Sequence, residues 1–237
     1  MKIDFHTHIL PAVDDGSSSI EESVELLKMQ KQRGVSVVVA TPHFYPHRDK
    51  PERFLERRNK AFQKLQEEIA GQQLPEVILG AEVYYFNGIS QWEGLKDLTI
   101  GETKYLLLEM PGTQWTDRML EDINGIYTKQ GIIPIIAHIE RYISFFNWRK
   151  ILKKLAELQV VIQVNGSFFL EHGKFAFKML KEGYIDIIAS DCHNTTSRKP
   201  NLHLVRELIE RQLGEEYLNR ITLTEQTILS KTINSRG

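Results

Sequence analysis

The 237-residue chain has little cysteine, no long apolar run and almost no net charge. Its single cysteine, Cys192, excludes a disulfide within the chain and a zinc module built from four cysteines. No apolar run is long enough to span a bilayer, so we expect no membrane insertion. The formal net charge of -1 provides no broad attraction for nucleic acid, which argues against a nuclease. The first residues contain no apolar stretch of signal-peptide length, and we therefore expect a cytoplasmic protein.

The composition is that of a globular protein with a sizeable core. Apolar residues make up 41% of the chain and charged residues 26%, and both values are typical of soluble domains. The length suits a single α/β barrel, which commonly runs to about 200–250 residues. We therefore expect one domain spanning residues 1–237, as a monomer or as a homo-oligomer.

Short apolar runs alternate with segments of helical periodicity along the chain. The runs are Lys2–Phe5, Val35–Ala40, Val77–Ala81, Tyr105–Leu108, Ile132–Ala137, Val160–Val164 and Ile185–Ala189. The helical segments are Ile20–Gln32, Pro51–Ile69, Asp117–Lys129, Asn147–Leu158, Phe175–Glu182 and Leu202–Leu213. Apolar runs without alternation are typical of strands buried on both faces, and strand–helix alternation predicts parallel strands with helical crossovers. The pattern predicts a barrel or a large open sheet.

Each predicted strand delivers polar or ionisable residues at its C-terminal end. In chain order they are His6, His8, His43, Glu82, Glu109, His138, Asn165, Asp191 and His193. One such residue alone is usually a structural group or a solvated charge at the rim. Convergence of such residues from seven strands indicates a functional site, because the C-terminal ends of parallel strands carry the active site in barrels and bind ligands in open sheets.

Histidines and carboxylates without thiolates suit manganese, zinc, iron or magnesium. Residues two apart on a strand share one side, so His6 and His8 can reach the same ion. By the same alternation we expect Asp4 on that side, as a hydrogen-bond partner of a ligating histidine. One carboxylate of Asp14 and Asp15 can bend back over the site from the following loop. Clustered carboxylates repel one another unless cations neutralise them, so we expect two or three divalent ions.

An ordered series of short motifs covers most of the chain. It comprises Asp4-Phe5-His6-Thr7-His8, Thr41-Pro42-His43, Gly80-Ala81-Glu82, Leu108-Glu109, Ala137-His138-Ile139-Glu140-Arg141-Tyr142 and Ser190-Asp191-Cys192-His193-Asn194. With this series the chain resembles the polymerase and histidinol phosphatase (PHP) superfamily, and within it the bacterial capsule-type protein-tyrosine phosphatases. The stretch at residues 110–115 departs from the common form of that family.

The resemblance implies a distorted seven-stranded (β/α) barrel, similar to a TIM barrel, with three ions at the C-terminal ends of the strands. Manganese is the first choice, with iron, zinc or magnesium as alternatives. The implied ligands are His6, His8, Glu82 and Asp191 for the first ion, Glu82, Glu109 and His138 for the second, and Asp15, His43 and His193 for the third. Arg141 and Arg198 match the phosphate-binding, catalytic arginines of the family.

The resemblance further implies removal of phosphate from tyrosines of a bacterial tyrosine kinase that regulates capsular or exopolysaccharide synthesis. In the mechanism we expect, a metal-activated hydroxide attacks phosphorus and the tyrosyl phenolate leaves, without a covalent enzyme intermediate. Two alternatives remain open. One is a PHP phosphatase acting on a small phosphate ester such as histidinol phosphate, and the other is a non-catalytic barrel that binds metal or a partner.

The spacing Cys192-x5-Arg198 also fits the cysteine-dependent phosphatases, whose thiolate attacks phosphorus. The loop contains no glycine, and Lys199-Pro200 prevents a helix from following directly, although a phosphate cradle of this kind needs both features. We therefore expect Cys192 to be a small packed residue and no nucleophile.

Further residues near the expected site have two interpretations. Tyr45, Trp115 and Tyr142 either form an aromatic rim for a phosphotyrosine ring or only cover the mouth of the barrel. His47 is more typical of a solvated loop residue than of a substrate contact. A basic cluster either is a solvated helix face or attracts an acidic kinase tail, and it consists of Arg48, Lys50, Arg53, Arg57, Arg58 and Lys60.

Overall fold

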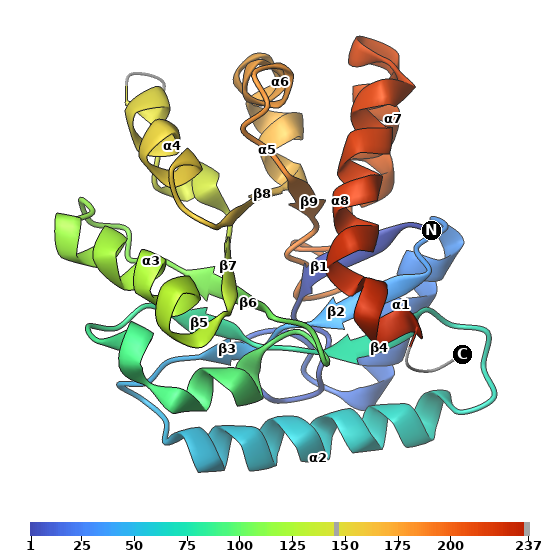
Figure 1. Ribbon diagram of the computed structural model, residues 1–237. Coiled ribbons are helices and arrows are strands. Elements are labelled where there is room, and N and C mark those ends of the chain that lie inside the picture. The colour runs from blue at the N-terminus through green and yellow to red at the C-terminus, as the bar shows by residue number, and fades with distance from the viewer. Residues whose placement is uncertain (145–146, 235–237) are drawn as a thin grey trace.

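Parallel strands form a curled wall with helices around its outside (Figure 1). The computed structural model describes residues 1–144 and 147–234. In this part of the chain the strands are β1 (Ile3–Thr7), β2 (Val37–Ala40), β3 (His43–Phe44), β4 (Glu76–Leu79), β5 (Glu82–Tyr84), β6 (Tyr105–Glu109), β7 (Ile133–Ile136), β8 (Val161–Asn165) and β9 (Ile187–Ala189). The α-helices are α1 (Ile20–Gln32), α2 (Pro51–Ile69), α3 (Asp117–Gln130), α4 (Trp148–Ala156), α5 (Gly166–Glu171), α6 (Gly173–Lys181), α7 (Leu202–Leu213) and α8 (Glu215–Asn234).

The strand order shows how the wall curls. One sheet has the order β1-β2-β4 and the other has the order β3-β5-β6-β7-β8-β9, and all the pairs are parallel. The last strand returns to the first, because Thr7 forms a parallel bridge with Cys192 and the His8 amide donates to the Cys192 carbonyl at 2.8 Å. As a result, the C-terminal ends of β1 and β9 lie side by side.

Each of the seven predicted apolar runs overlaps a strand, with ends that differ by up to two residues, whereas β3 and β5 were not predicted. Both are continuations: β3 follows β2 after Thr41-Pro42, and β5 follows β4 after Gly80-Ala81. Proline has no N–H to donate to a ladder, so regular pairing is interrupted at Pro42, although its carbonyl still accepts the Glu82 amide at 3.0 Å. The wall is thus split into two sheets where a single sheet was expected.

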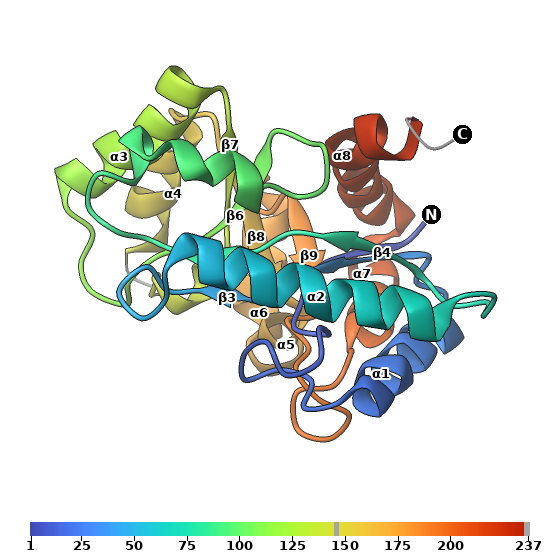
Figure 2. The ribbon, with the colours of Figure 1, turned by 90° about the horizontal axis from the view of Figure 1, so that it is seen from below.

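The strands are buried on both faces, as the unbroken apolar runs predicted. A large cluster fills the space between the strands and the helices, and α2 lies along the outside of the strands (Figure 2). A smaller cluster lies on the opposite face of the strands and includes Ile3 and Phe5 of β1. The unpredicted helix α8 adds Ile228 and Leu229 to the smaller cluster. Among the described residues, no helix is long and apolar enough to cross a membrane.

Local signals set the ends of the helices. The Ser19 hydroxyl accepts the Glu22 amide at the start of α1, and the Thr116 hydroxyl accepts the Met119 amide at the start of α3. Helix α3 ends at Gly131, whose φ of 70° is a left-handed conformation that glycine adopts at low cost. These caps fix where the chain leaves each helix and enters the next strand.

Candidate metal centre

The buried carboxylate of Glu82, at the start of β5, lies among four histidines. Its Oε2 atom lies 3.1 Å from His6 Nε2, 3.3 Å from His8 Nε2 and 2.9 Å from His43 Nδ1. Its Oε1 atom lies 2.8 Å from His138 Nε2. These residues come from the ends of β1, β3, β5 and β7, so the strands bring together side chains that are far apart in sequence.

Four histidines direct Nε2 toward the acidic side chains of the site and hold Nδ1 against a separate partner. The partners of Nδ1 are Gln163 Oε1 for His6 (3.4 Å), Asp14 Oδ2 for His8 (2.6 Å), the Tyr142 hydroxyl for His138 (3.0 Å) and the Asp191 carbonyl oxygen for His193 (3.0 Å). A hydrogen bond at Nδ1 orients the ring and fixes the tautomer, and this is how proteins present Nε2 to a metal ion.

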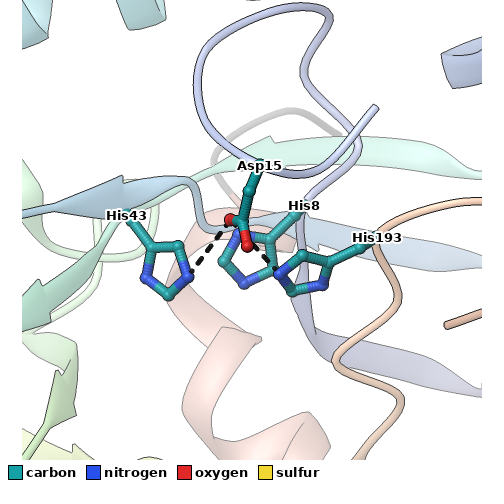
Figure 3. Close-up of side chains that lie close together, drawn as sticks. All are labelled: His8, Asp15, His43 and His193. Carbon is teal, nitrogen blue, oxygen red and sulfur yellow. Dashed lines mark ion pairs between the residues drawn. The ribbon is translucent and has the colours of Figure 1, made fainter. Parts of the chain in front are cut away.

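The donor atoms gather into three adjoining groups, each with its atoms within 4.8 Å of one another. The groups are His8, Asp15, His43 and His193; His6, His8 and Glu82; and His43, Glu82 and Glu109. Figure 3 shows the first group, in which the Asp15 carboxylate lies between His43 and His193 with His8 beside them. Because His8, His43 and Glu82 each belong to two groups, the three groups form a continuous cluster.

Two arginines reach the same cluster through Asp191. Its Oδ1 atom lies 3.4 Å from Nε2 of both His6 and His8. Its Oδ2 atom accepts hydrogen bonds from Arg141 at 2.7 Å and from Arg198 at 2.8 Å. The arginine side chains are 45% and 39% exposed, so their remaining N–H groups are accessible to an anion entering from solvent.

The cluster shifts the acidities of its own members. Burial opposes ionisation of Glu82, but attraction to His6 outweighs it and holds the pKa of Glu82 well below its usual value. Burial likewise opposes a charge on His6, and the attraction of Glu82 and Asp191 raises the pKa of that imidazole. Burial, followed by repulsion from Glu82, raises the pKa of Glu109 to about 7. The carboxylates thus repel one another and are stabilised by the positive charges beside them, so the cluster favours cations.

The chemistry of the cluster fits divalent metal ions. Four buried polar atoms without a hydrogen-bond partner among the described residues are His43 Nδ1, Glu82 Oε2, Glu109 Oε2 and His193 Nε2. Buried polar atoms are nearly always satisfied, because leaving one unpaired costs about 1–3 kcal/mol. A cation satisfies carboxylate oxygens and imidazole nitrogens together, so these atoms are the ones that metal ions would bind.

Backbone strain is concentrated at the same place. His138 and Asp191 have φ values of 32° and 53°, and only one other non-glycine residue in the described part of the chain, Ala12, has a positive φ. Conformations of this kind cost about 1–3 kcal/mol each and persist where the surrounding structure enforces them. They turn the chain sharply after β7 and β9, so that both side chains face the cluster.

The loop that follows β1 is held against His8. At Gly16 a Cβ atom would lie only 2.2 Å from the His8 carbonyl oxygen, so no side chain fits there. The Ser17 amide donates to that carbonyl at 2.9 Å, and the Gly16 amide donates to Asp14 Oδ1 at 3.0 Å. This close approach brings Asp14 to His8 and Asp15 to His43.

A sequence profile of the family described as "Capsular polysaccharide synthesis, CpsB/CapC" matches residues 2–230. The chain belongs to the CpsB/CapC family. It is 30% identical over 240 aligned positions to the tyrosine-protein phosphatase CpsB of Streptococcus agalactiae serotype III (strain NEM316), an alignment that covers 96% of this chain and 98% of that protein.

Solved structures agree with this CpsB/CapC membership. A structure from a study of YwqE from Bacillus subtilis and CpsB from Streptococcus pneumoniae, described as unique metal-dependent tyrosine phosphatases, matches with a TM-score of 0.80. The match has 25% identity and covers 94% of this chain and 93% of that one. The histidinol phosphate phosphatase of Lactococcus lactis matches with a TM-score of 0.54 and 14% identity, over 91% of this chain and 93% of that one, and shares the fold alone.

The structure brings all nine predicted ligand residues of this CpsB/CapC member into one cluster. They are His6, His8, Asp15, His43, Glu82, Glu109, His138, Asp191 and His193. The grouping differs from the expectation in two respects. His8 lies both with His6 and Glu82 and with the group that contains Asp15, and His43 also joins Glu82 and Glu109, where His138 was expected. Asp191 and His138 adjoin the groups through His6 and Glu82.

The predicted role of Asp4 is wrong. Its carboxylate accepts hydrogen bonds from Gln30 of α1 at 2.6 Å and from the Ser190 amide at 2.9 Å, on the face covered by the helix. The register of β1 against β2 shifts between Asp4 and Thr7, where three steps along β1 match two along β2. The additional residue breaks the alternation that would have put Asp4 on the side of His6.

The supporting roles of three residues were not predicted from the sequence, although Asn165 was among the polar residues at strand ends. Asp14 was considered only as a possible ligand, yet it holds Nδ1 of His8 and accepts the His43 amide at 2.9 Å. Gln163 accepts the His138 amide at 2.7 Å and donates to Asn165 at 2.9 Å. Asn165 in turn donates to Asp191 Oδ2 at 2.8 Å. The buried polar pair Gln163 and Asn165, two apart on β8, was the available signal.

Cys192 is a packed residue, as predicted. Its side chain is fully buried, and its sulfur accepts a long contact of 3.8 Å from Gln30, on the face opposite the metal cluster. Burial, with the nearby Asp4 carboxylate, raises the pKa of the thiol. A thiol of this kind does not form the thiolate that a cysteine-dependent phosphatase requires.

Aromatic side chains flank the cluster on two sides. Tyr45 stacks on His43 with ring centroids 5.0 Å apart, and His47 lies 5.8 Å from Tyr45. Trp115, from the divergent 110–115 stretch, lies 5.3 Å from Tyr142, whose hydroxyl holds His138. The aromatic residues singled out in the sequence therefore do lie beside the cluster.

Proposed function

We propose that this protein is a metal-dependent protein-tyrosine phosphatase that acts on a bacterial tyrosine kinase controlling capsular or exopolysaccharide synthesis. The observation that carries the proposal is the position of Arg141 and Arg198, which converge on one oxygen of Asp191 beside the histidine and carboxylate cluster. A planar guanidinium suits phosphate oxygens, and two of them beside a metal cluster suit a phosphate ester. The names of the relatives support phosphotyrosine as the phosphate ester that is hydrolysed.

We infer three divalent ions, with manganese as the first choice and iron, zinc or magnesium as alternatives. One set of ligands comprises His6, His8, Glu82 and Asp191, a second comprises Glu82, Glu109 and His138, and a third comprises Asp15, His43 and His193. We also infer that the wall is a distorted seven-stranded barrel, with β2–β3 and β4–β5 each counted as one interrupted strand. This arrangement would place every ligand at one end of the barrel.

When bound, the ions would lower the pKa of water and neutralise phosphate charge, which is what hydrolysis of a phosphate ester requires. The residues of the chain supply position and direction. Arg141 and Arg198 would hold the non-bridging oxygens of the phosphate, leaving phosphorus open to attack from the opposite side. Asp14, Gln163 and the Tyr142 hydroxyl would keep three imidazole rings in place during turnover.

The two aromatic pairs support an aryl phosphate over a small aliphatic ester. Tyr45 on one side and Trp115 with Tyr142 on the other offer flat apolar surface beside the cluster, which suits the ring of phosphotyrosine. A phenolate leaves more readily than an alkoxide, since the pKa of tyrosine is about 10. The chemistry and the surroundings thus favour the same substrate class.

The test compares phosphotyrosyl peptide with histidinol phosphate and p-nitrophenyl phosphate, using protein loaded with each metal in turn. We expect kcat/KM to be highest for the peptide. A preference for histidinol phosphate would assign the protein to small phosphate esters instead. Absence of turnover with every metal and ester, in protein that binds the metals, would favour a non-catalytic metal-binding barrel.

A further inference from the structure

A second binding feature adjoins the metal cluster, at the turn between β3 and α2. We propose that Arg48, with Arg57 behind it, forms a subsite for an anionic side chain that neighbours the phosphotyrosine of the substrate. This inference rests on the proposed phosphatase function and adds a sequence preference to it. The chemistry recognised is an oxyanion, either the carboxylate of a flanking residue or the phosphate of a second phosphotyrosine.

The subsite is a cavity of about 350 Å³ that shares a wall with the metal cluster. Asp15 and His43 form the shared wall, and the remainder is lined by Val13, Asp14, Tyr45, Arg48, Asp49 and Arg57. The Asp14 carboxylate is paired with His8, and the Asp49 carboxylate is paired with Arg57. A substrate whose phosphate lies at the cluster therefore has this cavity directly beside it. Because the phosphotyrosine side chain is long, the peptide backbone stays at the mouth, where the side chain of a neighbouring residue can enter the cavity.

The Tyr45 ring contacts both a residue of the metal cluster and Arg48. His43 stacks on Tyr45 with centroids 5.0 Å apart and an angle of 27° between the planes. The Arg48 guanidinium also lies over the Tyr45 ring, with its central carbon 5.0 Å from the ring centroid. A cation over an aromatic face is held by the ring quadrupole, so Tyr45 supports Arg48 at the mouth of the site.

The two arginines differ in how their charges are used. Arg57 forms an ion pair with Asp49, with Nη1 and Oδ2 2.6 Å apart, and its Nε atom is buried without a hydrogen-bond partner among the described residues. Arg48, by contrast, has an exposed side chain, and no carboxylate of the described residues lies within ion-pair distance of it. The outer part of the cavity therefore offers the uncompensated guanidinium of Arg48, which suits an oxyanion, while Arg57 is neutralised by Asp49 behind it.

The experiment uses wild-type protein loaded with manganese and one phosphotyrosyl peptide in four forms. A residue beside the phosphotyrosine is glutamine, glutamate, lysine or a second phosphotyrosine. At low ionic strength we expect kcat/KM to be about fivefold higher for the glutamate form than for the glutamine form, the upper end for an exposed ion pair. This ratio should fall toward one as salt is added. The doubly phosphorylated form distinguishes a phosphate from a carboxylate as the preferred anion.

Arg48→Ala should bring the ratio between the glutamate and glutamine forms to about one, since it removes the uncompensated charge. The matched control is Arg53→Ala on α2, an exposed arginine outside the cavity, which should keep the wild-type ratio. Arg48→Glu should reverse the preference, so that the lysine form becomes the better substrate. Because Arg48 is exposed, these changes do not open the core.

A wild-type ratio of one, or an unchanged ratio in Arg48→Ala, would overturn the subsite while leaving the phosphatase function intact. An equal loss in Arg48→Ala and Arg53→Ala would also overturn it, because the preference would then come from the general charge of the helix. Failure of the wild-type protein to hydrolyse any of the four peptides would reject the proposed function, and the subsite with it.

Discussion

Asp14 contacts His8 and His43, which together occur in all three donor groups, without belonging to any group itself, and its replacement gives a specific prediction. Its carboxylate makes three contacts, with His8 Nδ1 at 2.6 Å, the His43 amide at 2.9 Å and the Gly16 amide at 3.0 Å. Burial opposes its charge, but the interaction with His8 prevails and holds the pKa of Asp14 below its usual value. Asp14→Asn keeps the shape and removes the charge.

The expected size follows from the contact with His8. Hydrogen bonds to charged groups contribute about 1.5–3 kcal/mol, and partners of metal-binding histidines typically change metal affinity by about 10- to 100-fold. Because His8 lies in two of the three donor groups, we expect the loss of metal affinity to lie in the upper half of this range. The expected weakening is therefore about 30- to 100-fold in manganese affinity.

The assay is a manganese titration of chelator-treated protein, followed by calorimetry and by turnover of a phosphotyrosyl peptide. In Asp14→Asn the half-saturating concentration should rise, while kcat at saturating manganese should recover to within about threefold of wild type. Asp117→Asn is the control, because the Asp117 side chain is 88% exposed and remote from the cluster. An unchanged half-saturating concentration, or a low kcat that manganese does not restore in folded protein, would refute the reasoning.

The remaining predictions concern the arginines, the cysteine and a buried glutamate. Arg141→Ala and Arg198→Ala should each lower kcat/KM on the phosphotyrosyl peptide by about 100-fold or more, measured in steady state, because each removes a donor to the phosphate. Cys192→Ala should keep near-wild-type kcat and lose about 1 kcal/mol of unfolding free energy in urea, and complete loss of activity in folded protein would revive the thiolate mechanism. Burial raises the pKa of Glu225 from 4.5 to about 8, so folding favours its protonated form and the stabilising contribution of that form is lost as pH rises through this range. Urea unfolding should therefore show Glu225→Gln gaining stability relative to wild type between about pH 5 and pH 8, and a constant difference would contradict the assigned shift.

The fold was predictable where the pattern is local and strong. The bounds of α1, α2 and α7 agree with the predicted segments, because apolar periodicity and local signals define them within one stretch of sequence. Such signals are the Ser19 cap of α1 and Pro51 at the start of α2. Helix α8 was not predicted, although Ile228 and Leu229 complete the smaller apolar cluster, because its burial depends on strands far away in sequence. The break between β2 and β3 was missed because pairing, unlike periodicity, is a tertiary property.

The candidate site was predictable in its membership and less so in its support. The residues at strand ends converge because parallel strands place their C-terminal ends at one edge. His43 and Glu82, for example, follow the C-terminal ends of β2 and β4 and pair with each other at the starts of β3 and β5. Asp4 was misplaced because a shift in register cannot be read from the alternation of one strand. Gln163, on β8, supports His6 and His138, and only the three-dimensional structure reveals these contacts.

The central claim is that bound divalent ions are required for hydrolysis of phosphotyrosine, and exhaustive chelation tests it most directly. Metal-free protein, shown to be folded by circular dichroism and free of metal by elemental analysis, should not hydrolyse the phosphotyrosyl peptide. Adding manganese should restore turnover in proportion to the ions bound. Full activity in the metal-free protein would contradict the account.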